Sequence, residues 1–291
     1  MSKKILQLAL GSIFFLLLTS LLSPALANGL SPEEERDEIY MLTAYSVVFK
    51  DWQEAGPNKR GHNIGSILVD KEGTIVRWAR NCNTILNNGT QHGEVRLIIG
   101  YLNSSPKRML DGYTIYTTLE PCAQCSGMMI LTHVSRTVYG QTDPGFGKAI
   151  ERLALDSRQW NGNGYTPYPL TNKLTSNQSP CDYRVQLDNA YQEANTKYHE
   201  TKPNADLPIT RFLLSNPAKL IYQAAATALQ RYKVVHQDNQ VVLEQAKKFL
   251  TTIKKKVPTI TISANPEETE SPSSPIEKKQ KEERKETKVN Q

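Results

Sequence analysis

The chain has 291 residues, 38% of them hydrophobic, which is enough for one sizeable domain with appendages or for two small domains. Beyond residue 27 no stretch is apolar and long enough to cross a membrane, which excludes a protein with several membrane spans. The formal net charge of +6 falls to +4 once Lys3 and Lys4 are removed with the segment described next.

Residues 1–27 have the features of a secretory signal peptide. Lys3 and Lys4 form its positive start, the run from Ile13 to Leu22 is apolar, and Ala25-Leu26-Ala27 is a cleavage site of the A-x-A type. An uncleaved anchor is the alternative, because the stretch from Ile5 to Leu26 carries no charge and is just long enough to span a bilayer. Polar residues and a proline interrupt that stretch and favour cleavage. We therefore expect an exported protein, periplasmic or secreted, that is cleaved near Ala27.

The first element after this segment is a helix. Ser31 is a good N-cap, Pro32 suits the first helical position, and Glu34 completes a capping box, so the helix is predicted to run to about Lys50. A hairpin follows, with strands over residues 64–70 and 74–79 around a turn at 71–73. Residues 81–91 form a polar loop rich in asparagine.

Helices and strands then alternate. A helical pattern begins at His92, a strand is predicted over residues 113–118, a helix from Pro121 through Leu131, and a strand over residues 137–140. Strands that alternate with helices after an initial hairpin indicate an α/β fold with a mixed sheet.

The C-terminal half is less regular. Residues 151–180 have the composition of a loop, with a short fifth strand expected near Tyr168 to Lys173. Helices are predicted at residues 182–199, 216–236 and 239–256, and the last carries an apolar stripe of Val242, Ala246, Phe249, Leu250 and Ile253. From residue 257 onward Pro, Ser, Thr, Glu and Lys dominate, so the tail at 257–291 is predicted to be disordered.

Positive charge gathers in the extension formed by residues 207–256. Between Arg211 and Lys256 there are nine Lys and Arg against Asp238 and Glu244, a local net charge of +7. Such a surface could bind nucleic acid or an anionic lipid. Alternatively it is only the solvated face of packed helices, which the absence of interleaved aromatic or glycine residues favours.

Two short motifs carry the chemistry: His92-Gly93-Glu94 and, after 26 intervening residues, Pro121-Cys122-Ala123-Gln124-Cys125. One imidazole and two thiols provide three ligands for a zinc ion and leave the fourth tetrahedral position open for water. We therefore predict one zinc ion per chain, bound by His92, Cys122 and Cys125. Glu94 is then free to move protons.

Export into an oxidising compartment raises an alternative for the cysteines, because Cys pairs usually become disulfides there. Cys122 and Cys125 could form a redox C-x-x-C pair, but no strand-turn pattern of the thioredoxin kind surrounds them and the His-x-Glu motif would stay unexplained. Cys82 and Cys181 remain, either as a disulfide or as two inert buried thiols.

The reaction that fits these groups is hydrolytic loss of an amine from an amidine-like ring carbon. Hydroxide delivered by zinc would attack that carbon, while Glu94 takes the proton of the water, gives it to the ring nitrogen and then protonates the leaving amine.

The segment from Tyr116 to Met128, which reads YTTLEPCAQCSGM, resembles the second motif of the cytidine/deoxycytidylate deaminase superfamily. It is most similar to the branch that holds tRNA adenosine deaminases, guanine deaminases and fungal-type cytosine deaminases. The resemblance covers roughly residues 35–150 and includes GSILV at 65–69 and VYG at 138–140. It implies a three-layer α/β/α sandwich around a mixed five-stranded sheet, with residues 31–150 as the zinc deaminase core, residues 151–200 as an associated loop and helix, and a C-terminal helical extension. It also implies a homodimer.

The same resemblance implies substrate contacts. Asn81, at the end of the second strand, would bind the base, with Asn83 as the fallback. The Gly93 N–H and the Glu120 carbonyl would touch the ring and the leaving amine. His-Gly-Glu occurs in cytosine deaminases, whereas tRNA and guanine enzymes commonly carry His-Ala-Glu. The export signal, the long loop at 151–180 and the basic helices after residue 211 depart from all three groups and leave the substrate open.

Three functions follow from this pattern. The leading hypothesis is an exported zinc hydrolase that deaminates a nucleobase or nucleoside. The second is a deaminase that acts on nucleic acid, such as a tRNA adenosine deaminase or a secreted nucleic-acid deaminase, with the basic helices as its binding arm. The third is a non-catalytic module that retains a zinc ion, against which the intact Glu94 argues.

Overall fold

A computed structural model describes residues 29–253 of the chain. The predicted signal peptide and the predicted disordered tail lie outside the described residues. Within residues 29–253, none of the helices is both long and apolar enough to span a bilayer.

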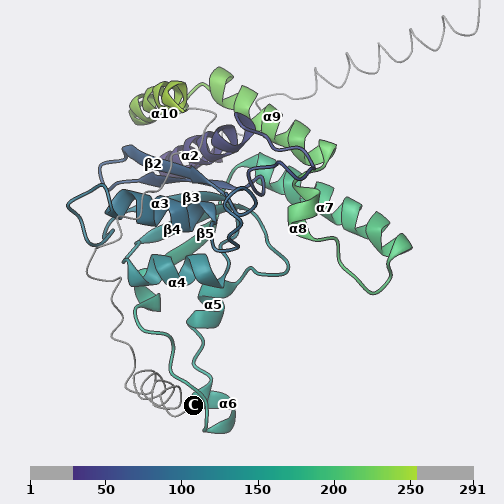
Figure 1. Ribbon diagram of the computed structural model, residues 1–291. Coiled ribbons are helices and arrows are strands. Elements are labelled where there is room, and N and C mark those ends of the chain that lie inside the picture. The colour runs from purple at the N-terminus through teal and green to yellow at the C-terminus, as the bar shows by residue number, and fades with distance from the viewer. Residues whose placement is uncertain (1–28, 254–291) are drawn as a thin grey trace, which may run out of the picture. The chain divides into compact units, whose positions relative to one another are not determined.

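A five-stranded mixed sheet forms the centre of the domain (Figure 1). Its strands are β1 (Gly65–Val69), β2 (Ile75–Arg80), β3 (Thr114–Leu119), β4 (Arg136–Gln141) and β5 (Thr175–Gln178), in the spatial order β2-β1-β3-β4-β5. The β1 strand pairs antiparallel with β2 and β3, whereas β3, β4 and β5 run parallel. The predicted hairpin and the predicted mixed sheet are therefore confirmed.

Helices cover both faces of this sheet. On one face lie α3 (Gly93–Leu102) and α4 (Ala123–Leu131). On the other lie α2 (Pro32–Phe49), which contacts four of the strands, and α7 (Asp182–Thr201), which contacts β4. The predicted N-terminus of α2 is confirmed: the Ser31 side chain and the Glu34 side chain form a capping box. The predicted three-layer sandwich is likewise confirmed.

The C-terminal helices form a further layer over α2. They are α8 (Ile209–Phe212), α9 (Asn216–Arg231) and α10 (Gln240–Thr252), with a short 3-10 turn, η3 (Gln237–Asn239), before α10. Both α9 and α10 contact α2, so this helix is covered by the sheet on one side and by the extension on the other (Figure 1). The buried residues of α9 and α10 are Ala218, Tyr222, Ala225, Leu229, Leu243, Ala246 and Leu250. In the predicted stripe of α10, Val242 and Phe249 are only partly buried, and Leu243 lies deeper than either.

The segment between β4 and α7 differs most from the prediction. Residues 151–180 contain the end of one short helix, α5 (Ala149–Leu153), the whole of another, α6 (Arg158–Asn161), and a 3-10 turn, η2 (Thr171–Lys173). The fifth strand exists, but its predicted position near Tyr168 to Lys173 is wrong because β5 begins at Thr175. The β5 strand is polar, since it pairs only with β4 at the edge of the sheet.

Candidate active site

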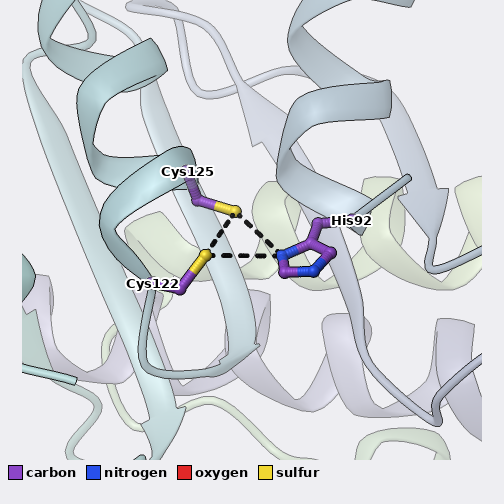
Figure 2. A group of neighbouring side chains, drawn as sticks. All are labelled: His92, Cys122 and Cys125. Carbon is purple, nitrogen blue, oxygen red and sulfur yellow. Dashed lines mark hydrogen bonds between the residues drawn. The ribbon is translucent and has the colours of Figure 1, made fainter. Parts of the chain in front are cut away.

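The side chains of His92, Cys122 and Cys125 meet at one point (Figure 2). His92 Nδ1 lies 3.4 Å from the Cys122 sulfur and 3.5 Å from the Cys125 sulfur, and the two sulfurs lie 3.6 Å apart. Three ligands of a tetrahedral zinc ion, at the usual bond lengths to nitrogen and sulfur, would be about 3.6–3.8 Å from one another. The donor set and its spacing thus fit zinc.

The fold brings these ligands together because two helices begin at the same end of the strands, where β2 and β3 finish. His92 is the N-cap of α3 and Cys122 the N-cap of α4. The α4 helix therefore starts two residues later than predicted, after Pro121, although Cys125 still lies in its first turn. Free N–H groups and the positive end of the helix dipole favour a thiolate at such a position.

The charges of the two thiols depend on each other. Hydrogen bonds from Cys125, and to a smaller extent the contact with His92, lower the pKa of Cys122 to about 4. The same contact with Cys122, together with burial, raises the pKa of Cys125 well above its usual value. Two sulfurs this close cannot both carry a negative charge unless a cation lies between them, which is what a metal ion provides.

Glu94 lies beside this group, in the first turn of α3, with only 3% of its surface exposed. Thr117 donates a hydrogen bond of 2.9 Å to Glu94 Oε1, and Ser66 donates one of 3.1 Å to Thr117 Oγ1. Ser66 and Thr117 face each other across β1 and β3. Burial raises the pKa of Glu94. Ser66 and Thr117 were missed in the sequence. Ser66 is a hydroxyl in an otherwise apolar strand, whereas Thr117 is one of three threonines in β3 and nothing distinguishes it from the others.

Asn81 follows directly after β2 and is almost fully buried at the same edge of the sheet. Its Oδ1 accepts a 2.7 Å hydrogen bond from the Gly93 N–H, so the start of α3 holds the Asn81 side chain in place. Arg60 donates to the Asn81 carbonyl and fixes its backbone. Asn81 lines the pocket described below, whereas Asn83, the fallback, is not among its described lining residues.

Glu120 is buried at the end of β3 and binds the loop after β4. Its carboxylate accepts hydrogen bonds from the backbone N–H groups of Asp143, at 3.0 Å, and Lys148, at 2.7 Å. A β-carbon on Gly147 would collide with this carboxylate and with the Asp143 carbonyl, so the close approach of the loop requires glycine. The Glu120 side chain thus shapes the site, in addition to the role predicted for its carbonyl.

These groups line a cavity of about 630 Å³. One part of its lining comes from the region of the two motifs and includes His92, Glu94, Asn81, Glu120 and Cys122. The other part includes Tyr191 on α7, the loop at residues 143–146, and residues 206–210, which we call the strap. The strap was missed in the sequence analysis, because nothing in its composition marks it and it lies more than 80 residues after Cys125.

An α/β/α sandwich that carries a His-Cys-Cys group and a buried glutamate at one edge of its sheet defines a domain of the zinc-hydrolase class. Residues 35–141 match the family described as the cytidine and deoxycytidylate deaminase zinc-binding region. This part of the chain therefore belongs to the cytidine and deoxycytidylate deaminase superfamily, as the resemblance predicted.

Curated relatives cover the same part of the chain. The tRNA-specific adenosine deaminase of Bacillus subtilis is 33% identical over 112 residues, which are 38% of this chain and 66% of that protein. The probable cytosine deaminase of Schizosaccharomyces pombe is 28% identical over 118 residues, 40% of this chain and 68% of that protein. The match thus spans about two thirds of the length of these two relatives and 57% or less of the next two.

Solved structures resemble the chain more distantly. A guanine deaminase from Nitrosomonas europaea has 15% sequence identity and a TM-score of 0.35, over 71% of this chain and 94% of that one. A guanine deaminase from Bacillus subtilis has 20% identity and a TM-score of 0.31, over 47% of this chain and 85% of that one.

Proposed function

We propose that this chain is a zinc-dependent hydrolase that removes an amino group from a free nucleobase or nucleoside. One observation carries the proposal: His92, Cys122, the buried Glu94 and Asn81 line a single cavity, Cys125 lies beside the first two, and the described lining contains no Lys or Arg. A cavity of this size suits a small molecule.

The residues have separable roles. His92, Cys122 and Cys125 would hold zinc, which supplies a Lewis acid that makes a water molecule more acidic. Glu94 would accept the two protons of that water in turn, and give the first to the ring nitrogen and the second to the departing amine. Its burial and its bond to Thr117 keep the carboxylate in place for these transfers. Asn81 orients the ring by hydrogen bonds from its side-chain amide.

The charge of the cavity supports an uncharged substrate. Its described lining contains the carboxylates of Glu94, Glu120, Asp143 and Asp206 and no cationic Lys or Arg side chain to meet a phosphate. A nucleotide or an oligonucleotide would therefore bring negative charge toward carboxylates of the same sign. A free base or nucleoside brings none.

The packing of the extension supports the same substrate class. The α9 and α10 helices pack on α2, and Lys219 is paired with Glu54 at 2.5 Å. These helices thus have a structural task that accounts for their presence. Deamination of nucleic acid remains the second candidate function, because the first of the relatives above is a tRNA-specific adenosine deaminase.

A substrate panel tests the proposal. The zinc-loaded protein is incubated with cytosine, adenine and guanine as free bases, nucleosides, 5′-monophosphates and short single-stranded oligonucleotides, and released ammonia is measured. We expect turnover of a base or nucleoside and none of the oligonucleotides. Deamination of oligonucleotides alone, with binding that weakens by a log-log salt slope of about −0.7 per phosphate contacted, would select the second candidate.

We further propose that the protein is exported and cleaved after Ala27, on the strength of the positive start, the apolar run and the A-x-A site. Mass spectrometry of the mature chain should find Asn28 as its first residue. An intact Met1 in the membrane fraction would instead indicate an anchor.

We also propose that the protein forms a homodimer. Analytical ultracentrifugation of the mature chain would measure its mass in solution and test this prediction.

A further inference from the structure

The strap, Asp206 to Thr210, is fastened to one face of α7. Tyr191 donates a 2.7 Å hydrogen bond to the Leu207 carbonyl, and Asn195 Oδ1 accepts one of 2.6 Å from the Leu207 N–H. Residues 191, 195 and 199 are four apart and so share one face of the helix. This face binds both backbone groups of Leu207 and fixes the strap where it lines the cavity.

The same face of α7 orients the carboxylate of Asp206. Asn195 Nδ2 donates a 3.0 Å hydrogen bond to Asp206 Oδ1, and His199 Nε2 lies 2.8 Å from the same oxygen. No described residue donates to the second oxygen, Oδ2. The Asp206 side chain is 74% exposed, yet the residue lines the cavity. It therefore offers a carboxylate oxygen that is held in position and open to a ligand.

The size of the cavity leaves a part of the substrate for the strap to contact. The amino-bearing ring carbon has to lie at the zinc ligands and Glu94, and the ring lies against Asn81. A cavity of about 630 Å³ is larger than one planar ring fills. Whatever is attached to the ring extends toward the rest of the lining, which includes the strap, Tyr191 and the loop at residues 143–146, as well as His62 and Gln124.

The chemistry of a fixed carboxylate selects the attached group. A carboxylate only accepts hydrogen bonds, and two neighbouring hydroxyls are well suited to donate to it. The ribose of a nucleoside carries such a pair, whereas a free base has none. The negative charge also disfavours a phosphate group nearby.

We propose that Asp206 is a specificity-determining residue that binds the ribose hydroxyls, so that the substrate is a ribonucleoside and not a free base. This inference rests on the proposed deaminase function and narrows its substrate. Asn195 and His199 act through Asp206 as positioning residues.

Matched substrates test the inference. For the zinc-loaded full-length mature protein, kcat and KM are measured with the base, the ribonucleoside and the 2′,3′-dideoxyribonucleoside of whichever ring is turned over. We expect the ribonucleoside to have the highest kcat/KM. Asp206→Ala should lower that kcat/KM about tenfold, the effect of losing hydrogen bonds to a charged group in a partly exposed site. The change should be in KM, with the dideoxyribonucleoside and the base unaffected.

Two further variants test whether Asp206 binds the substrate or only supports the strap. Asp206→Asn retains an acceptor for Asn195 and His199 but removes the charge, so it should give a smaller loss with the same substrate pattern. Glu200→Gln removes an equal charge from an exposed site on α7 and should change nothing. An equal loss with all three substrates in Asp206→Ala and Asp206→Asn would mean that Asp206 only supports the strap, and would overturn the inference.

A binding measurement separates this inference from the proposed function. In a Glu94→Gln background, which should not turn over substrate, calorimetry with the cytosine, adenine and guanine ribonucleosides and bases is repeated with and without Asp206→Ala. Tighter binding of ribonucleosides that is lost with Asp206→Ala supports the inference. Equal binding of base and ribonucleoside contradicts it, while the proposed function stands or falls with ammonia release by the unmodified chain.

Discussion

The two ends of the cavity are built in different ways. At the zinc-ligand end, Glu94 and Cys125 are almost completely buried and held by the first turns of two helices. At the strap end, Asp206 is largely exposed and is held by side chains of α7. In the proposed function the buried end carries the groups that react, and the exposed end carries groups that only bind the substrate. Substitutions in the two regions should therefore affect different kinetic constants.

Removal of the C-terminal extension should have the largest effect, because loss of the fold would disrupt both ends of the cavity at once. A chain that stops after Thr210 loses Phe212 and Leu213, which are buried beside the strap, and exposes the face of α2 that α9 and α10 cover. We expect this chain to be insoluble or unfolded, as measured by circular dichroism and size-exclusion chromatography. A folded, active truncated protein would show that the extension is dispensable.

Loss of a zinc ligand comes next. Cys125→Ser replaces a soft thiolate ligand, so we expect zinc content well below one ion per chain and no detectable turnover, measured by metal analysis and ammonia release. Cys181→Ser is the matched control: Cys181 is also a buried free thiol, but it is the N-cap of α7, where serine is well tolerated. Full zinc content in Cys125→Ser would remove this residue from the ligand set.

Glu94→Gln should spare the metal and remove the proton carrier. Zinc content and thermal unfolding should stay near those of the unmodified chain, while kcat falls by at least about 10²–10⁴-fold, the usual contribution of a general acid–base group. Near-normal activity in a zinc-loaded variant would contradict the proposed role of Glu94.

The smallest effect is expected at the strap. Asn195→Ala removes the hydrogen bonds to Leu207 and Asp206, so KM should rise about tenfold while kcat changes little, since the buried end is untouched. Thr196→Ala, on the neighbouring exposed position of α7, is the control. A fall in kcat at constant KM would show that the two ends are not separable.

The sequence predicted the buried end far better than the exposed one, for a physical reason. The capping box at Ser31 and the spacing of His92 and Glu94 are local patterns, and each specifies a local geometry. The β5 strand was misplaced because an edge strand with polar side chains carries no apolar alternation. The pairing of Tyr191 and Asn195 with Leu207 spans a loop, and only the packed tertiary structure brings those residues to the cavity.

The position of α2 between the sheet and the extension has a consequence for the order of folding. Glu35, near its start, accepts hydrogen bonds from the backbone of Val235, at 2.5 Å, and His236, at 3.1 Å, and from Asn239. This helix near the N-terminus thus needs partners that are synthesised some 200 residues later. Contacts so distant along the chain slow folding, because a long loop has to close before they form. The domain can be completed only after the residues of η3 have left the ribosome.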